Sequence, residues 1–319
     1  MPVLPMTTLP SEEQGVALVI GNFDGVDRGH QALVKYTVEI AARFGLRARA
    51  MTFDPHPAML LSGKAPAVLT QLTRKVSLLR ASAPNFDVIV QPFDRQFANL
   101  LPREFVERIL VNHVHVRQLV VGANFRFGRD RAGCADDFVR FGAELGFAAH
   151  AFELSGDAQG CFSSSRIRCL VAEGELSQAR ALLGRPHAIS GSVIRGDGRG
   201  RTIGFATANL GGVEEQLPPE GVYAALAQLL PSGPVHSSVL CPAAVHIGPR
   251  PTVDRDASIE AHLIGHTGEI YERGLRLHLI KRLRGLVRFD GIEALRAQIS
   301  LDVQATSDAA AASDPFVEP

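Results

Sequence analysis

The fold of this chain is decided by residues 16–44, which read VALVIGNFDGVDRGHQALVKYTVEIAARF. The first apolar run, Val16 to Gly21, is short and rich in β-branched residues, as is typical of a buried strand. A glycine-rich turn follows, and from Gln31 to Phe44 apolar residues recur at the spacing of one helix face. The segment therefore predicts a strand, a tight turn and a helix, which together begin a βαβ unit.

The same alternation continues to about Leu154. Further strands are predicted at residues 48–53, 88–90 and 119–122, and further helices at residues 73–81, 103–112 and 136–145. Strands that alternate with helices in this way are typical of an α/β domain with a doubly wound parallel sheet. Ligands bind such a sheet beyond the carboxyl ends of its strands, where the turn after Gly21 is expected to lie.

A different pattern begins after Gly184, which together with Pro186 forms a helix stop signal. Five short strands are predicted at residues 187–194, 222–229, 238–246, 259–264 and 275–280, followed by a helix at 291–302. This pattern predicts a small antiparallel β-barrel with a C-terminal helix. We therefore expect one domain at residues 1–184, a second at 185–303, and a small, polar, disordered tail at 304–319.

The composition excludes several classes of protein. The 319 residues contain 33 basic and 33 acidic side chains, so the net charge of +0 argues against a dedicated nucleic-acid binder. No apolar run approaches the ~20 residues that span a bilayer, and Met1 to Gln14 lacks the features of a secretory signal. We expect a cytoplasmic protein that acts on small molecules, without nucleic acid or membrane. Its oligomeric state stays open.

The turn from Gly21 to His30 is the first candidate for chemistry. A helix N-terminus that follows a buried strand presents main-chain N–H groups to a phosphate. His30, at the start of the helix, can donate a further hydrogen bond. The alternative is a plain glycine-rich turn with a capping histidine, and an isolated turn does not decide between the two.

Four motifs in this half of the chain resemble those of the prokaryotic bifunctional riboflavin kinase/FAD synthetase family. They are GNFDGVDRGH at 21–30, TFDPHP at 52–57, VGANFRFG at 121–128 and SSSRIR at 163–168. The resemblance implies adenylylation of FMN by ATP. It also implies a nucleotide and phosphate site of Gly21, Asp24, Gly29, His30, Asn124, Ser163, Ser164 and Arg168, a catalytic role for His30, and flavin contacts from His56 and Arg126. Taken alone, these residues are a helix cap, a solvated loop and a hydrogen-bonded histidine.

One position departs from the family's H-x-G-H pattern, because Asp27 stands where its first histidine would be. A carboxylate ~4 Å from a phosphate charge is repelled by roughly 1–4 kcal/mol. This predicts adenylyl transfer that is slower by about one to three decades. The alternative is that Asp27 binds Mg²⁺, which restores the attraction.

The second half carries its own motifs. Residues 191–210, GSVIRGDGRGRTIGFATANL, resemble the riboflavin kinase signature, with Ala206 where that family has proline. The resemblance implies a loop of Gly196, Gly198 and Gly200 over the ATP phosphates, Mg²⁺ ligands at Thr207 and Asn209, and a general base at Glu260. Taken alone, these residues are a glycine-rich hairpin, a polar turn and a surface glutamate. Further departures, at Gly265, His266, Glu272 and Leu286, lie on the side where flavin is expected.

The sequence therefore predicts a two-domain transferase that uses ATP and Mg²⁺ to convert riboflavin to FMN and FMN to FAD. Two alternatives stay open. One is a riboflavin kinase whose first domain no longer transfers adenylate efficiently because of Asp27. The other is a flavin- or nucleotide-binding protein without catalytic activity. The flavin itself, riboflavin or a modified analogue, also stays open.

Overall fold

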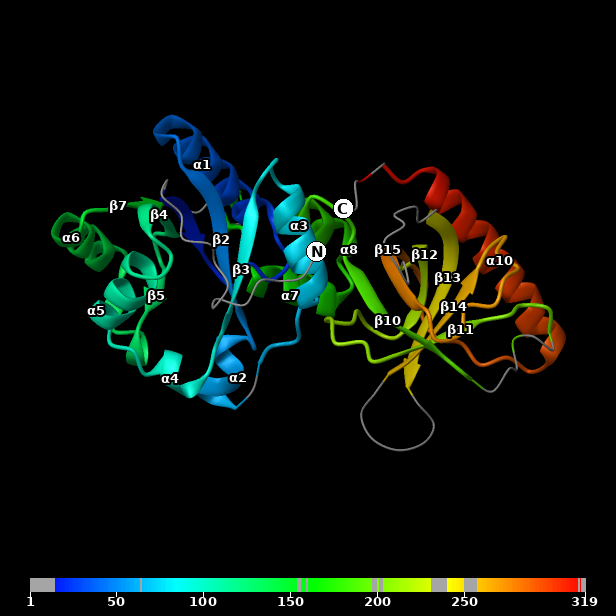
Figure 1. Cartoon of the computed structure of the whole chain (residues 1–319). Coiled ribbons are helices and arrows are strands. Elements are labelled where there is room, and N and C mark those ends of the chain that lie inside the picture. Colours follow the sequence, from blue (N-terminus) through cyan, green and yellow to red (C-terminus); the bar gives the residue numbers. More distant parts are fainter. Residues whose placement is uncertain are drawn as a thin grey trace. The chain divides into compact units, whose positions relative to one another are not determined.

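The structure is a computed structural model that describes residues 15–63, 65–153, 156–158, 160–196, 200, 203–230, 240–249, 257–314 and 316. The chain forms two compact units (Figure 1). Within the described residues, unit 1 comprises 15–66 and 72–164, and unit 2 comprises 67–71 and 165–316. The division thus falls before Ser165 and not at residue 184, because helix α8 (Leu176–Leu183) contributes Leu176 to the apolar core of unit 2.

Unit 1 is built on a parallel sheet in the strand order β3-β2-β1-β4-β7. Its strands are β1 (Val16–Ile20), β2 (Arg47–Asp54), β3 (Asp87–Pro92), β4 (Val116–Gly122) and β7 (Ala148–Phe152). Its helices are α1 (Arg28–Phe44), α2 (Pro57–Ser62), α3 (Leu72–Ala81), α4 (Arg95–Ala98), α5 (Pro102–Glu104), a π-helix (Phe105–Val111) and α6 (Ala135–Leu145). The predicted doubly wound sheet is confirmed.

Strand β1 lies in the middle of this sheet and is buried on both faces. Leu18 and Ile20 pack in the cluster that contains the π-helix and α6, whereas Ala17 and Val19 pack in the cluster that contains α1 and α3. The chain adds β2 and β3 on one side of β1, and β4 and β7 on the other. The strand order therefore reverses between β1 and β4, and the crevice at such a reversal is where ligands bind.

Unit 2 is a closed antiparallel barrel in the order β10-β11-β14-β13-β12-β15. The strands are β10 (Ala188–Ile194), β11 (Ala208–Gly211), β12 (Gly221–Leu229), β13 (Leu240–Pro249), β14 (Ala257–Leu263) and β15 (Gly274–Arg284). Helix α7 (Ser164–Glu173) and α8 precede the barrel, and α10 (Ile292–Ala311) follows it. The predicted barrel with a C-terminal helix is confirmed. None of the described helices is long and apolar enough to cross a membrane.

The C-terminal helix corrects the predicted tail. Helix α10 continues through residues 304–311, which were expected to be disordered. This stretch is rich in alanine, the residue with the highest helix propensity, and it buries Thr306 and Ala309. The helix is also anchored by Asp302, whose carboxylate accepts hydrogen bonds from Nη2 and Nε of Arg284 on β15 at 2.7 and 3.0 Å.

The short segment 67–71 belongs to unit 2, although the chain on both sides of it belongs to unit 1. The main-chain N–H of Gln216 donates to the carbonyl of Val68 at 2.7 Å, and Nε2 of Gln71 donates to the buried Glu215 carboxylate at 3.3 Å. Burial raises the pKa of Glu215 more than hydrogen bonds from Ser190 and the main chain lower it.

Candidate functional site

The loop between β1 and α1 lies at the reversal point of the unit 1 sheet. Phe23 and Val26 adopt positive φ angles of 50° and 42°, which are uncommon for residues other than glycine. Their side chains are fully or almost fully buried, so packing holds the loop in this conformation. The loop therefore presents the start of α1 in one defined arrangement.

Asp27 is the N-cap of α1 and forms a reciprocal capping box with His30. Its Oδ1 accepts a hydrogen bond from the main-chain N–H of His30 at 3.0 Å, and its Oδ2 lies 3.1 Å from Nδ1 of the same ring. Burial by itself raises the pKa of Asp27, but the hydrogen bonds and charge of His30 and the N–H of Gly29 outweigh it, so the pKa lies below its ordinary value. The carboxylate thus faces His30 and the helix end.

Ser164, at the start of α7, lies against the same loop. Its hydroxyl donates to the carbonyl of Asp24 at 2.8 Å. A Cβ atom at Gly29 would lie 3.3 Å from Cβ of Phe162, so α1 approaches this segment closely. Two motifs that are far apart in the sequence therefore meet at the N-terminus of α1. Arg168 lies one turn further along α7, where its Nε donates to the carbonyl of Ala67 at 2.7 Å.

Three further predicted residues of this half, His56, Asn124 and Arg126, come from two loops. His56 caps α2, its Nδ1 accepts from the N–H of Ala58 at 3.1 Å, and its Nε2 lies 3.4 Å from Nδ2 of Asn22. The His56 motif therefore touches the loop between β1 and α1. Asn124 and Arg126 are exposed and follow β4, whose carboxyl end neighbours that of β1.

Lys75 is a residue of this site that the sequence analysis missed. Its Nζ donates to the carbonyl of Asn22 at 3.1 Å, and Thr52 donates to the same oxygen at 3.0 Å. Burial lowers the pKa of Lys75, although the charges of Asp24 and Asp54 act in the opposite direction. A signal was present in the sequence, since Lys75 falls on the apolar face of α3, beside Val76 and between the turns that carry Leu72 and Leu79.

The predicted residues of unit 2 meet on the outer face of the barrel. Ile259 and Ala261 point into its core, so Glu260 between them points outward. Asn209 on β11 is the register partner of Glu260 on β14, and the Thr207 hydroxyl donates to Oε2 of Glu260 at 3.3 Å. The half-buried Glu260 carboxylate therefore has an amide and a hydroxyl as neighbours.

The glycine loop lies against these side chains. A Cβ atom at Gly196 would overlap the Asn209 amide, and one at Gly200 would lie 3.2 Å from Oγ1 of Thr207. Two of the three predicted loop glycines thus approach the two predicted metal ligands. Gly198 lies outside the described residues.

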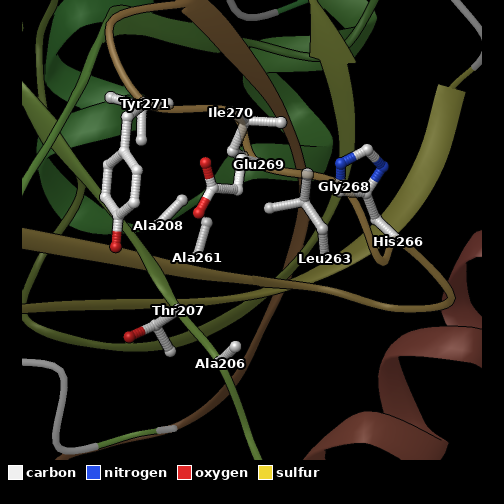
Figure 2. A pocket seen from close by; sticks show the side chains of 11 residues that line it. Ala206, Thr207, Ala208, Ala261, Leu263, His266, Gly268, Glu269, Ile270 and Tyr271 are labelled. Atoms are coloured by element: carbon white, nitrogen blue, oxygen red, sulfur yellow. The ribbon is translucent and has the colours of Figure 1, made fainter.

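A pocket opens beside Thr207. Thr207 and Ala206 form one wall, and Tyr271, Ile270 and Glu269, from the segment between β14 and β15, form the wall opposite (Figure 2). Leu263, Ala208 and other apolar side chains also line the pocket, together with His266. The pocket therefore combines apolar walls with the polar groups of Thr207, His266, Glu269 and Tyr271.

Comparisons with known proteins match both units. The FAD synthetase family model matches residues 9–166, and the Riboflavin kinase family model matches residues 183–310. The bifunctional riboflavin kinase/FMN adenylyltransferase of Escherichia coli (strain K12) is 38% identical over 295 residues, 91% of each chain. The protein of the same name from Bacillus subtilis (strain 168) is 32% identical over 319 residues, 94% of each chain.

A solved structure has the same fold. The crystal structure of the macrolide-efflux protein from Streptococcus pneumoniae superposes with a TM-score of 0.83 at 25% sequence identity. The superposition covers 97% of the present chain and 98% of the other. The arrangement of a parallel sheet followed by a barrel is therefore shared over nearly the whole length of both chains.

Proposed function

Since this chain belongs to the bifunctional riboflavin kinase/FMN adenylyltransferase family, we propose a site and a mechanism for each of its two reactions. The chain is a transferase of flavin cofactor biosynthesis. It phosphorylates riboflavin to FMN with ATP, and it adenylylates FMN to FAD with ATP. A cytoplasmic location stays a prediction from composition.

The kinase reaction is assigned to the outer face of the barrel, with Glu260 as the general base. Glu260 accepts the proton of the riboflavin 5′-hydroxyl as that oxygen forms a bond to the γ-phosphorus of ATP, and ADP leaves. The observation that carries this assignment is the 3.3 Å hydrogen bond that the hydroxyl of Thr207, a residue that lines the pocket, donates to Oε2 of Glu260. Gly196 and Gly200 bring the backbone of the glycine loop against Asn209 and Thr207.

Magnesium fits the same residues. The Thr207 hydroxyl and the Asn209 amide oxygen are hard oxygen donors, and the Glu260 carboxylate adjoins both. No group of three or more His, Cys, Asp or Glu side chains that could hold a metal occurs in the described part of the chain. A site of few protein oxygens suits Mg²⁺, which is usually held by one or two protein groups together with substrate phosphates. When bound, the ion neutralises charge on the transferred phosphoryl group.

Adenylyl transfer is assigned to the N-terminus of α1. A phosphate oxygen of FMN forms a bond to the α-phosphorus of ATP while the bond to pyrophosphate breaks, so little covalent chemistry falls to the protein. Positioning and charge stabilisation are what the site must supply. His30 at the start of α1 supplies a donor there, and the start of α7 at Ser164 adjoins it.

The kinase assignment is tested by Glu260→Gln, which keeps the size of the side chain but removes its basicity. We expect riboflavin phosphorylation to fall by about 10²–10⁴ in kcat, while FMN adenylylation by the same chain stays unchanged. The matched control is Glu293→Gln, because Glu293 is an exposed glutamate on α10. Wild-type phosphorylation by Glu260→Gln would sink the assignment.

The magnesium assignment has its own test. Thr207→Ala and Asn209→Ala each remove one oxygen donor, so both variants should need more Mg²⁺ for half-maximal riboflavin phosphorylation. Magnesium titrations that coincide with that of the wild type in both variants would place the metal elsewhere.

A further inference from the structure

Asp27 and His30 form a more closely coupled pair than helix capping requires. Only 2% of the Asp27 side chain is exposed, against 20% of the His30 side chain. The Nδ1 atom of His30 lies 3.1 Å from Oδ2 of Asp27 and 3.3 Å from the main-chain N–H of Asp27. These two neighbours require opposite protonation states of Nδ1. The carboxylate oxygen can accept a hydrogen bond only if Nδ1 carries a proton, whereas the main-chain N–H can donate only if Nδ1 has a free lone pair.

The buried charge of the Asp27 carboxylate determines the protonation state of Nδ1. Oδ2 of Asp27 is a buried, charged oxygen that accepts no hydrogen bond from the described residues, and Nδ1 of His30 lies 3.1 Å from it. A proton on Nδ1 places a donor beside this oxygen, at the cost of the hydrogen bond from the neutral main-chain N–H of Asp27. Leaving a buried charged group unpaired costs more than leaving a neutral one unpaired. Nδ1 therefore carries a proton.

The orientation of the ring follows from the same contacts. Nδ1 is held toward the helix cap, and Phe23 packs edge-on against the ring with a centroid distance of 5.3 Å. The two ring nitrogens point in diverging directions, so Nε2 points away from the cap. To donate to a phosphate oxygen, Nε2 must be protonated as well, and the ring is then an imidazolium.

We propose that Asp27 is a positioning residue for adenylyl transfer, which holds the His30 ring through Nδ1 and balances its positive charge so that Nε2 donates a charged hydrogen bond to the nucleotide phosphates. The proposal rests on the assignment of adenylyl transfer to the start of α1. It gives Asp27 a role opposite to the repulsion expected from sequence, because the carboxylate faces the imidazole. A carboxylate that orients a catalytic imidazole through its other nitrogen is a recurring arrangement in enzymes.

The test is Asp27→Asn in the full chain. Asparagine caps helices as well as aspartate does, but its amide nitrogen donates to Nδ1 and makes the ring neutral, with its proton on Nε2. We expect the kcat of FMN adenylylation to fall by about tenfold, the factor that separates a charged from a neutral hydrogen bond. The KM for FMN and the rate of riboflavin phosphorylation should change little. An Asp27→Asn variant that adenylylates FMN at the wild-type rate would overturn the proposal.

A second measurement needs no variant at Asp27. In full-length protein labelled with ¹⁵N-histidine, the His30 resonances are assigned among the 11 histidines by their loss in His30→Gln. We expect Nδ1 to have the ¹⁵N shift of a protonated nitrogen in the wild type, and the shift of an unprotonated one in Asp27→Asn if that variant folds. An unprotonated Nδ1 in the wild type would refute the proposal.

The His30→Gln variant separates the proposal from its premise. Wild-type adenylylation by His30→Gln would show that the reaction does not use this histidine, and the assignment to the start of α1 would fail together with the proposal. Slow adenylylation by His30→Gln combined with full activity of Asp27→Asn would overturn the role of Asp27 alone.

Discussion

The contact between the glycine loop and Asn209 leads to a quantitative prediction for Gly196→Ala. An added Cβ atom would overlap Nδ2 of Asn209 and lie 2.6 Å from its Cγ, whereas ordinary contacts begin at 3.4 Å. The Asn209 side chain or the loop must therefore move by more than 0.8 Å, because the overlap with Nδ2 is larger than that with Cγ. The backbone angle of Gly196 is one that alanine also adopts, so the substitution acts through space alone.

The expected effect follows from that displacement. A misplacement of ~1 Å in a catalytic arrangement can cost about 10² in rate. We therefore expect the kcat/KM for ATP in riboflavin phosphorylation to fall by roughly 10²-fold, with a higher Mg²⁺ requirement. Overpacking costs stability, but alanine also reduces the entropy of the unfolded chain, so the net change in unfolding free energy should stay within about 2 kcal/mol.

The assay is product chromatography with riboflavin and MgATP, and FMN adenylylation by the same chain serves as the internal control. The matched variant is Gly291→Ala, because a Cβ atom at Gly291 has open space around it and should leave both activities unchanged. Riboflavin phosphorylation at the wild-type rate in Gly196→Ala would show that the loop does not pack on Asn209, or that Asn209 is not part of the site.

Two further predictions concern buried carboxyl groups in unit 2. Asp302→Asn leaves the Arg284 guanidinium without its charged partner and should destabilise the barrel by about 3 kcal/mol, measured by the urea concentration that half-abolishes riboflavin phosphorylation; an unchanged midpoint would contradict the pairing. Because the folded-state pKa of Glu215 is raised above its ordinary value of 4.5, the wild type loses stability as the pH rises from that value toward the folded-state pKa. Glu215→Gln should therefore have a higher melting temperature than the wild type at neutral pH, and the difference should become smaller below pH 4.5. The same difference in melting temperature at every pH would contradict a raised pKa for Glu215.

The spacing of apolar residues predicted most of the fold, because this spacing depends on whether a segment is a strand or a helix. The run from Val16 to Gly21 and the helical spacing after Gln31 placed β1 and α1 correctly. The start of α1 at Arg28 was missed because a capping box made by aspartate and histidine differs from the usual Ser/Thr and Glu/Gln pair. The alanine-rich C-terminus was expected to be disordered, since its composition does not show that Thr306 finds a buried place on the barrel.

For the candidate sites, the sequence predicted residues but not the contacts between them. Thr207 and Glu260 were singled out from motifs 53 positions apart, but their contact depends on strand pairing that periodicity does not specify. The role of Asp27 was also beyond the sequence, because a substituted residue in a motif does not reveal which way its side chain turns. Lys75 was missed although it lies on the apolar face of α3, because the sequence does not show that its Nζ reaches the Asn22 carbonyl.

The inclusion of residues 67–71 in unit 2 has a practical consequence for anyone who wishes to separate the two enzymes. A fragment that starts at Ser165 would lack residues 67–71, which form two hydrogen bonds with the rest of unit 2. Val68 accepts one from Gln216, and Gln71 donates one to the Glu215 carboxylate. Removing residues 67–71 would expose Glu215, which is now 3% accessible, to water. A cut before Ser165 leaves every barrel strand intact but separates residues 67–71 from the rest of unit 2. The same loss would accompany the exchange of one unit between relatives at this position.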